Sequence, residues 1–260
     1  MMTCKVSIIT ICLNNVNSIK ATIESVINQN YSDIEYILID GGSSDGTLEI
    51  ISDYKDGIAK IISEPDRGLY DAINKGLKLA TGDVVGLIHA GDRLFDNYVI
   101  EKIASFFIDN HVDIIYGHSL LVNEFDKPVR VNRSPRFRRS LVARGWMPSH
   151  QSIYLRRHLL MQYGYYNLRL HPSSDYEFFL RYFYFNCLRI KLLDVYILKF
   201  AMGGRSTKNY MNNLKAQKQH KECWRINGKE PPILLIPLKL LRKPIQFIRA
   251  YFLRFTGYSF

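Results

Sequence analysis

Two apolar runs near the N-terminus decide the fold. Residues 5–11 read KVSIITI, and residues 34–40 read IEYILID and lead directly into GGSSDGT at 41–47. Both runs are short and rich in isoleucine, a pattern typical of strands buried inside a parallel sheet. Between them, Ser18–Asn28 has the spacing of an amphipathic helix. A strand, a helix and a second strand therefore open the chain and predict an α/β fold.

The same alternation continues outward to residue 116. Helices are expected at Asp45–Tyr54, Leu69–Ala80 and Tyr98–Asn110, and strands at Ile58–Ile62, Asp83–Ile88 and Val112–Tyr116. This order predicts a Rossmann-like, mostly parallel sheet that is covered by helices. Ligands bind such sheets beyond the carboxyl ends of the strands. The polar residues that fall there are Asn14, Asp40, Glu64, Asp66, His89 and Asp92.

The pattern changes after residue 117. Short β-like pieces are expected near Leu120–Phe125 and Gln151–Leu155, a helix over Ser174–Tyr184, a strand over Arg189–Phe200 and a polar helix over Lys208–Ile226. We place a soft boundary near residue 117, inside one compact unit. A firmer boundary lies near residue 228, because Asn-Gly and Pro-Pro pairs punctuate the chain there.

The net charge of +11 is concentrated in two segments that contain no Asp or Glu. Residues 127–144 contain Lys127, Arg130, Arg133, Arg136, Arg138, Arg139 and Arg144. Residues 231–260 contain Lys239, Arg242, Lys243, Arg249 and Arg254. Basic chains bind polyanions, anionic lipid surfaces or phosphorylated ligands. No known nucleic-acid-binding motif accompanies the charge, so nucleic acid is not an expected partner.

The C-terminal segment has the pattern of an amphipathic helix. On a helical wheel with Lys239 at the origin, the basic residues and Gln246 gather on one arc and apolar residues occupy the other. The pattern predicts a basic helix lying on an anionic membrane surface. The alternative is a helix packed on the body of the protein. Pro237 and Pro244 predict a short first piece and a longer second one.

Cysteine usage and hydropathy indicate the compartment. Cys4, Cys12, Cys187 and Cys223 form no CxxC pair and no zinc spacing, which suits free thiols in a reducing environment. The apolar run Val6–Leu13 lacks the cleavage site of a signal peptide. No uncharged apolar stretch reaches the roughly 18 residues that span a bilayer. We expect a cytoplasmic protein.

The stretch from Asp40 to Thr47 joins a strand to a helix. Its glycines let the backbone approach a ligand, and the helix N-terminus could attract a phosphate. The GxGxxG spacing of dinucleotide-binding proteins is absent. A carboxylate only accepts hydrogen bonds, so Asp40 could accept the imide N–H of a uracil. Asp45 is either a ligand contact or, more simply, a helix cap.

Carboxylates also follow other predicted elements. Asp92 comes after a glycine at a strand end, and Mg²⁺ and Mn²⁺ often take one or two carboxylates plus substrate phosphates. His89 is either a ligand or a satisfied structural histidine. Arg67 could pair with diphosphate oxygens. Asp175 could act as the general base toward a sugar hydroxyl, or it could cap its helix.

Together, the stretches Val6–Thr10, Ile39–Thr47 and Ser63–Gly76 resemble family 2 glycosyltransferases, and most of all bacterial enzymes of exopolysaccharide and lipopolysaccharide assembly. The resemblance covers roughly residues 5–205. It implies a GT-A fold, an inverting mechanism and a divalent metal, Mg²⁺ or Mn²⁺. It implies a nucleotide diphosphate sugar as donor, with UDP favoured, and a glycan or lipid-linked acceptor. With the basic tail, it places the enzyme at the inner face of the plasma membrane.

The resemblance also implies roles for residues. Asp40 contacts the nucleoside base, Asp92 binds the metal as the last Asp of a DxD-type motif, and Asp175 is the catalytic base. Ser149-His150-Gln151 matches an acceptor-side segment, so His150 and Gln151 are acceptor contacts. Gly203-Gly204-Arg205-Ser206 resembles a late loop that closes over the donor. The expected donor contacts are Thr10, Asn14, Asp40, Asp66, Arg67, Asn74, His89, Gly91, Asp92 and Arg205.

Three positions depart from the family pattern. His89 stands where Asn is frequent, Gly91 where Asp is frequent, and Gly41 where a second Asp is common. Only one carboxylate therefore remains near the metal, so weak metal binding is expected. The implied organisation is a nucleotide-sugar-binding half at 1–117, an acceptor-binding half at 118–228 and a membrane-associating tail at 229–260.

Three other functions compete with this interpretation. A nucleotidyltransferase shares the strand–helix plan but needs a glycine-rich N-terminal loop followed by Lys or Arg, which residues 10–15 do not supply. A nucleic-acid-binding protein is suggested only by the charge. A catalytically inactive protein of the same fold is suggested by Gly91.

Overall fold

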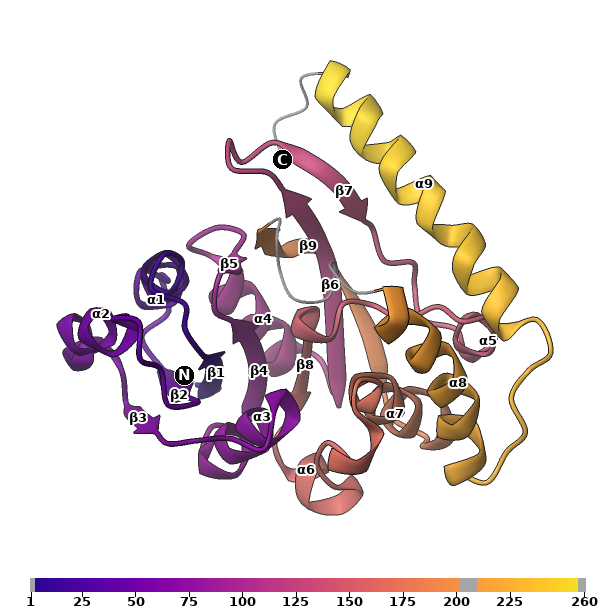
Figure 1. The fold of residues 1–260 in the computed structure, drawn as a ribbon, viewed down its shortest axis with the longest axis horizontal. Coiled ribbons are helices and arrows are strands. Elements are labelled where there is room, and N and C mark those ends of the chain that lie inside the picture. The colour runs from indigo at the N-terminus through magenta and orange to yellow at the C-terminus, as the bar shows by residue number, and fades with distance from the viewer. Residues whose placement is uncertain (1–2, 202–209, 257–260) are drawn as a thin grey trace.

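The first buried run becomes a central strand of the parallel part of the sheet in the computed structural model, which describes residues 3–201 and 210–256 (Figure 1). This strand, β1 (Val6–Cys12), lies between β2 (Ile34–Asp40) and β4 (Val84–His89), and β3 (Lys60–Ser63) pairs with the outer edge of β2. All of these pairings are parallel. The predicted parallel sheet in the first half is therefore confirmed.

Helices cover both faces of these strands. On one face, α1 (Ile19–Ile27), α2 (Thr47–Asp53) and α4 (Val99–Asp109) pack around Ile8. On the other face, α3 (Leu69–Leu79) and α7 (Ser174–Leu180) pack around Ile9. Neighbouring residues of β1 thus enter different cores, which explains why the strand is apolar at nearly every position.

The second half extends the sheet with strands of mixed direction. The strand order is β3-β2-β1-β4-β8-β6-β9-β5, with β7 paired to β6. The added strands are β5 (Arg93–Leu94), β6 (Ile114–Val122), β7 (Pro128–Asn132), β8 (Ile153–Arg156) and β9 (Ile190–Ala201). The β6–β9 pairing is parallel, whereas β8 runs antiparallel to both β4 and β6. Residue 117 falls inside β6, so the two strand pieces predicted on either side of it form one strand.

Short helices cover the second half of the sheet. They are α5 (Arg139–Ala143), α6 (His158–Tyr163) and α7, which continues as a π-helical turn at Arg181–Phe185. The predicted polar helix is α8 (Tyr210–Ile226), and it packs on α7 through the buried Trp224.

The C-terminal helix corrects one prediction. α9 runs without a break over Leu235–Thr256, although Pro237 and Pro244 were expected to divide it. Pro237 lies in the first turn, where backbone N–H groups have no helical partner anyway. Pro244 lies in the interior, and its missing N–H costs one helical hydrogen bond without ending the helix. Within the described ranges, no helix combines the length and apolarity needed to cross a bilayer.

Candidate active site

Asp40 organises the loop that follows β2. Its buried carboxylate accepts hydrogen bonds from the amides of Gly42 and Ser43, at 3.1 and 3.0 Å, and from the hydroxyls of Ser43 and Ser63. Burial alone would raise the pKa of Asp40, but these hydrogen bonds outweigh it and hold the pKa below its ordinary value. Asp40 therefore shapes the loop, and a base could reach its carboxylate only if the loop moved.

Asn14 joins this loop to the end of β1. Its backbone N–H donates to Ser43 Oγ at 2.8 Å, and its Oδ1 accepts from the Ser44 amide at 3.0 Å. Its φ of 54° lies in the left-handed region, which asparagine tolerates. Asp45 accepts from the Thr47 amide at 3.1 Å beside the start of α2. The N-cap of α2 is Gly46, so Asp45 bonds the first helical amide from the residue before the cap.

Asp66 lies against the same loop. A Cβ on Gly41 would be 3.0 Å from Asp66 Oδ2, so Gly41 leaves room for this carboxylate. The second Asp that is common at position 41 would displace Asp66. Lys75 pairs with Asp66 at 2.6 Å and with Glu64 at 2.8 Å. The corner beyond β2 therefore holds three carboxylates and one lysine.

Arg67 is exposed and is bound by the helix that follows it. Its side chain is 80% exposed, and its guanidinium forms a salt bridge with Asp71 at 3.0 Å. The Arg67 amide also donates to Asp71, at 3.0 Å. A phosphate would have to compete with Asp71 for this guanidinium.

Asp92 follows β4 and is contacted only by neutral donors among the described residues. One carboxylate oxygen accepts from Gln151 Nε2 at 2.8 Å, and the other accepts from the Ala201 amide at 3.3 Å. Burial raises the pKa of Asp92 to about 6, against the opposing effect of these two hydrogen bonds. Gly91 has a φ of 95°, and its amide donates to Thr22 Oγ1 at 2.9 Å. The described part of this loop thus holds a buried carboxylate beside two neutral hydrogen-bond donors.

His89 and His150 meet across the gap between β4 and β8. Their Nε2 atoms are 2.8 Å apart, so one ring donates and the other accepts. Burial is the main cause that lowers the pKa of both, so the pair is neutral at neutral pH. The His89 amide donates to Gln151 Oε1 at 2.7 Å. Gln151 therefore bridges the end of β4 and Asp92.

Asp175 lies in the first turn of α7. Its Oδ1 accepts from the Tyr176 amide at 2.8 Å and from the Tyr70 hydroxyl at 3.3 Å. Tyr70 comes from the first turn of α3, and its single hydroxyl proton is shared between Asp175 and the Pro172 carbonyl, which is closer at 2.8 Å. Burial lowers the pKa of His150, and the negative charge of Asp175 opposes part of this effect. Asp175 therefore lies close enough to the histidine pair to act on it electrostatically.

Two residues that were expected to contact the donor are buried in the structure. Thr10 is fully buried inside β1, where it accepts from the Tyr36 hydroxyl at 3.0 Å. Asn74 is buried on α3, and its amide exchanges hydrogen bonds of 2.9 and 3.0 Å with the backbone of Tyr166. Arg205 lies outside the described residues. The other expected residues all lie along the carboxyl edge of the sheet.

Three residues that the sequence did not single out complete the arrangement. Tyr70 holds Asp175, Thr22 holds the Gly91 amide and the Asp92 carbonyl, and Ser63 holds Asp40. Tyr70 lies inside the stretch that carries the family resemblance, so the sequence could have placed it near the site. Its contact with Asp175 could not be predicted. Thr22 carries no comparable signal, because it looks like an ordinary residue of a buried helix face.

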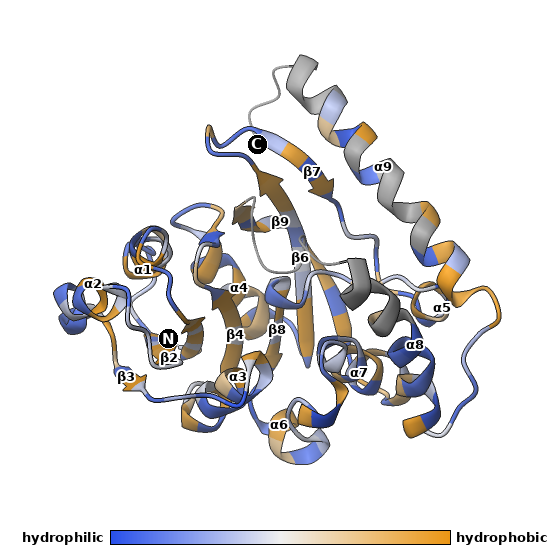
Figure 2. Cartoon of the chain, viewed as in Figure 1, coloured by the Kyte–Doolittle hydropathy of each residue, from blue (hydrophilic) through white to orange (hydrophobic). Residues whose placement is uncertain are grey.

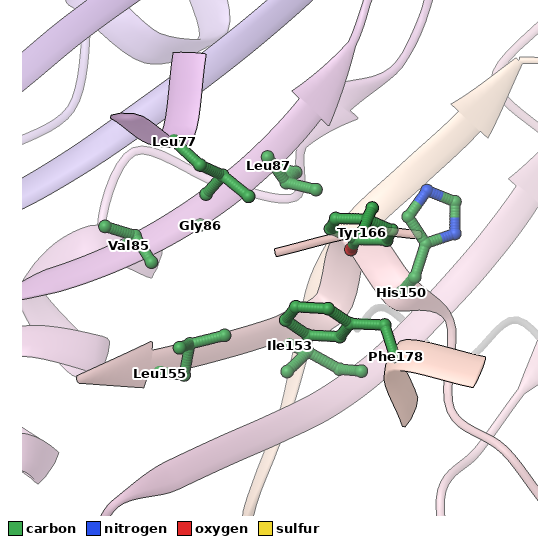
Figure 3. Close-up of a pocket in the computed structure, with 9 residues that line it drawn as sticks. All are labelled: Leu77, Val85, Gly86, Leu87, His150, Ile153, Leu155, Tyr166 and Phe178. Carbon is green, nitrogen blue, oxygen red and sulfur yellow. The ribbon is translucent and has the colours of Figure 1, made fainter. Parts of the chain in front are cut away.

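A small cavity lies in the core beside His150 (Figure 3). It is lined by Leu77, Val85, Gly86, Leu87, His150, Ile153, Leu155, Tyr166 and Phe178. Nearly all of these side chains are apolar, so the cavity lacks the charged or donor groups that would bind a diphosphate.

The residues around Asp92 fit a divalent cation on their chemistry. A cation beside this carboxylate would offset the burial that raises its pKa. Among the described residues, no three His, Cys, Asp or Glu side chains are grouped so that they could hold a metal by themselves. Substrate phosphates and water would have to supply the remaining ligands, as is common for Mg²⁺.

Comparison with known proteins finds glycosyltransferases among the relatives of this chain. A Mycobacterium tuberculosis protein named PGL/p-HBAD biosynthesis glycosyltransferase is 31% identical over 213 residues, which cover 77% of this chain and 78% of that protein. The cholesterol galactosyltransferase of Borreliella burgdorferi is 35% identical over 125 residues, which cover 46% of this chain and 35% of that enzyme.

Solved structures share the fold at low sequence identity. TarS 1–349 of S. aureus in complex with UDP is 19% identical, with a TM-score of 0.69 and coverage of 96% of this chain and 74% of that one. The mannosyltransferase PcManGT of Pyrobaculum calidifontis, in complex with GDP-Man and Mn²⁺, is 18% identical, with a TM-score of 0.66 and the same coverage. The fold is therefore GT-A. Residues 7–181 match the family model described as Glycosyl transferase family 2, and the chain belongs to that family.

Proposed function

We propose that this glycosyltransferase transfers a sugar, with inversion, from a nucleotide diphosphate sugar to a hydroxyl of a glycan or lipid-linked acceptor. One observation carries the proposal. Asp92 and Asp175 come from separate halves of the chain, and the His89–His150 pair relates them. His89 ends the strand that precedes Asp92, and the charge of Asp175 acts on His150. One carboxylate can thus serve the leaving diphosphate while the other serves the acceptor hydroxyl.

The donor would lie along the loops beyond β1, β2 and β4. Asn14 and the corner formed by Asp40, Gly41 and Asp66 would surround the nucleoside base, and a carboxylate there can accept the imide N–H of uracil. UDP is the favoured nucleotide on that basis and on the family resemblance. UDP and GDP-Man occur in the TarS and PcManGT structures, respectively, so a nucleotide diphosphate donor is common to proteins of this fold.

Asp92 is the residue that would hold Mg²⁺ or Mn²⁺, with Gln151 fixing the orientation of its carboxylate. A divalent cation bound there supplies positive charge that stabilises the leaving diphosphate. This role makes Gln151 a positioning residue for Asp92 and differs from the acceptor contact that the family resemblance implies. Arg67 would add a charge-assisted hydrogen bond once it leaves Asp71.

Asp175 would act as the general base. Its carboxylate would take the proton of the acceptor hydroxyl as the oxygen attacks the anomeric carbon. The bond from that carbon to the diphosphate oxygen breaks in the same step, and the nucleoside diphosphate leaves with the electron pair. Attack from the face opposite the leaving group inverts the anomeric configuration. Tyr70 would hold Asp175 in place for this step.

The acceptor and the location follow from the relatives and from the charge. The names of the two relatives concern PGL/p-HBAD biosynthesis and cholesterol, respectively, which favours a lipid-linked acceptor used at the inner face of the plasma membrane. A lipid-linked acceptor would keep the reaction at a membrane surface, where the basic tail was expected to lie.

The test is a panel of UDP-, GDP- and dTDP-sugars, measured by thermal shift with and without Mn²⁺ or Mg²⁺. A metal-dependent rise in melting temperature with one donor is expected, followed by turnover whose product has the inverted anomeric configuration by NMR. If no donor stabilises the protein, and it instead binds arbitrary duplex DNA with steep salt dependence, the nucleic-acid alternative gains support. Donor binding without hydrolysis or transfer would indicate an inactive protein of the same fold.

A further inference from the structure

The basic residues of the acid-free segment 127–144 are left without acidic partners. None of them forms a salt bridge with any residue in the ranges 3–201 and 210–256. Just outside the segment, by contrast, Arg93 and Lys199 both pair with Asp126. Arg133, Arg136 and other members of the segment are exposed. Uncompensated exposed charge of one sign favours an anionic partner.

α9 lies along this segment in the opposite direction. The first turn of α9 packs closely against Gly145. A Cβ added at Gly145 would be only 2.8 Å from the Leu235 carbonyl oxygen. Toward its other end, Gln246 Nε2 donates to Asn132 Oδ1 at 3.2 Å, and Ala250 is buried in a cluster with Val131. The two acid-free segments are about one hundred residues apart in the sequence, yet they lie side by side (Figure 1).

Three apolar side chains are exposed among the described side chains of α9. Leu241 is 66% exposed, Ile248 54% and Tyr251 61%. The connection before the helix adds Ile233 at 96% and Leu234 at 60%. Leu241 and Ile248 are seven residues apart and therefore share one line along the helix. Figure 2 shows hydrophobic residues on this connection and at intervals along α9.

We infer that α9 and the segment 127–144 together form a docking surface for an anionic lipid bilayer. The helix would lie flat, over about 33 Å, with Leu241, Ile248 and Tyr251 toward the acyl chains. The arginines of the neighbouring segment would contact phosphate headgroups. This single partner would contact both the exposed apolar side chains of α9 and the unpaired cations of the segment 127–144.

Other occupants use only part of the surface. A two-fold dimer through this face would place the same arginines against one another, and like charges repel. A nucleic acid would engage the cations but would leave the aliphatic line of α9 exposed to water. An anionic bilayer accounts for both features and for their adjacency.

The surface also reaches the acceptor side of the active site. Lys239, in the second turn of α9, places its Nζ 4.5 Å from the ring centroid of Tyr176, the residue after Asp175. Docking through α9 would therefore hold the Asp175 helix close to the bilayer. This last step rests on the proposed function, whereas the binding of lipid does not.

The experiment uses the full chain and extruded vesicles of phosphatidylcholine alone or with phosphatidylglycerol, measured by co-sedimentation. We expect binding to the anionic vesicles that weakens as salt is added. The double variant Arg133→Gln/Arg136→Gln should bind them about 25-fold more weakly, at about fivefold per arginine. Its matched control is Lys55→Gln/Arg169→Gln, two exposed cations elsewhere, which should bind as the wild type does.

The apolar line is tested separately. Ile248→Gln should weaken vesicle binding about tenfold, whereas Met161→Gln, at a residue that is 75% exposed on α6, should not. The inference is overturned if the wild type binds both vesicle types equally, or if either control weakens binding as much as its partner variant. It is also overturned if the wild type is a dimer in sedimentation velocity and Ile248→Gln converts it to a monomer without weakening vesicle binding. Loss of sugar transfer in a vesicle-free assay would count against the proposed function and not against this surface.

Discussion

Burial raises the pKa of Asp92 to about 6 from an ordinary 3.8, so folding favours the protonated carboxyl. The folded state is therefore more stable, relative to the unfolded state, at low pH than at high pH. This added stability is complete below the ordinary pKa and is lost as the pH rises through about 6. We expect Asp92→Asn to raise the free energy of unfolding by about 1–2 kcal/mol at pH 8, because a neutral amide replaces a buried charge. Urea unfolding at pH 5 and pH 8 measures the difference. A variant that is less stable than the wild type at pH 8 would contradict the prediction.

The same substitution should act in the opposite direction on function. In the proposed mechanism, loss of the carboxylate would weaken the binding of the cation beside the leaving diphosphate, and we expect transfer to fall about a hundredfold or more. UDP affinity should also lose its dependence on Mn²⁺, as measured by calorimetry. Asp53→Asn on the exposed face of α2 is the control and should change neither property. Wild-type rates across a metal titration would remove Asp92 from the metal site.

Asp175→Asn tests the proposed general base. An amide keeps the size and the contact with the Tyr176 amide but cannot take a proton from the acceptor. We expect transfer to fall about 10²- to 10⁴-fold with donor affinity unchanged. Tyr70→Phe removes one hydrogen bond to Asp175 and should cost only about tenfold or less. A change in donor affinity with normal transfer would place Asp175 on the donor side instead.

At the scale of single elements, α3 is held to the segment before α7 by one side chain. Asn74 is buried and bonds to both backbone groups of Tyr166. We expect Asn74→Ala to lower the free energy of unfolding by about 1–3 kcal/mol, because it leaves buried polar groups unpaired. Donor affinity of the folded protein should not change. A selective loss of donor affinity at unchanged stability would restore the donor contact that the family resemblance implied for Asn74.

The elements that could be predicted are those whose apolar runs are uninterrupted. β1, β2 and β4 begin and end within one residue or so of their predicted limits. β6 was divided because Gly117, His118 and Ser119 interrupt its apolar run, although His118 is buried by contacts with distant residues. Gly117 is required there, since a Cβ would lie 2.6 Å from the side chain of Ile197.

The positions of the candidate site residues were predictable to the level of the strand ends. Asp40, His89 and Asp92 were located because a parallel sheet presents its carboxyl edge to ligands. Which side chain turns inward depends on partners that are remote in the sequence. Thr10 is covered by Tyr36 and Asn74 by Tyr166, and neither pairing leaves a trace in local periodicity.

At the scale of the whole molecule, contacts between distant residues build the candidate active site. The His89–His150 contact and the Tyr70–Asp175 hydrogen bond both connect residues before position 117 with residues after it. The proposed donor and acceptor halves therefore share one sheet and are joined along its carboxyl edge.

Contacts across the whole molecule also bury one side of α9 and leave the other side exposed. Leu235 is 1% exposed and packs into the main core with Trp224, whereas Ile248 is 54% exposed on the outer side. We expect Leu235→Ala to lower the free energy of unfolding by about 2–4 kcal/mol, and Ile248→Gln to change it by less than about 0.5 kcal/mol. Urea unfolding of the two full-length variants under one buffer condition provides the measurement.

Point variants are preferable to deletion of the tail, because removing residues from 231 onward would also expose the core around Leu235. That deletion would lower stability and membrane binding together and could not assign either effect to one side of the helix. If Ile248→Gln destabilises the protein as much as Leu235→Ala, the outer side of α9 is part of the core. The orientation of the helix, and with it the lipid-docking surface, would then be wrong. If only Leu235→Ala destabilises, the body side holds the fold and the apolar outer side is available for lipid.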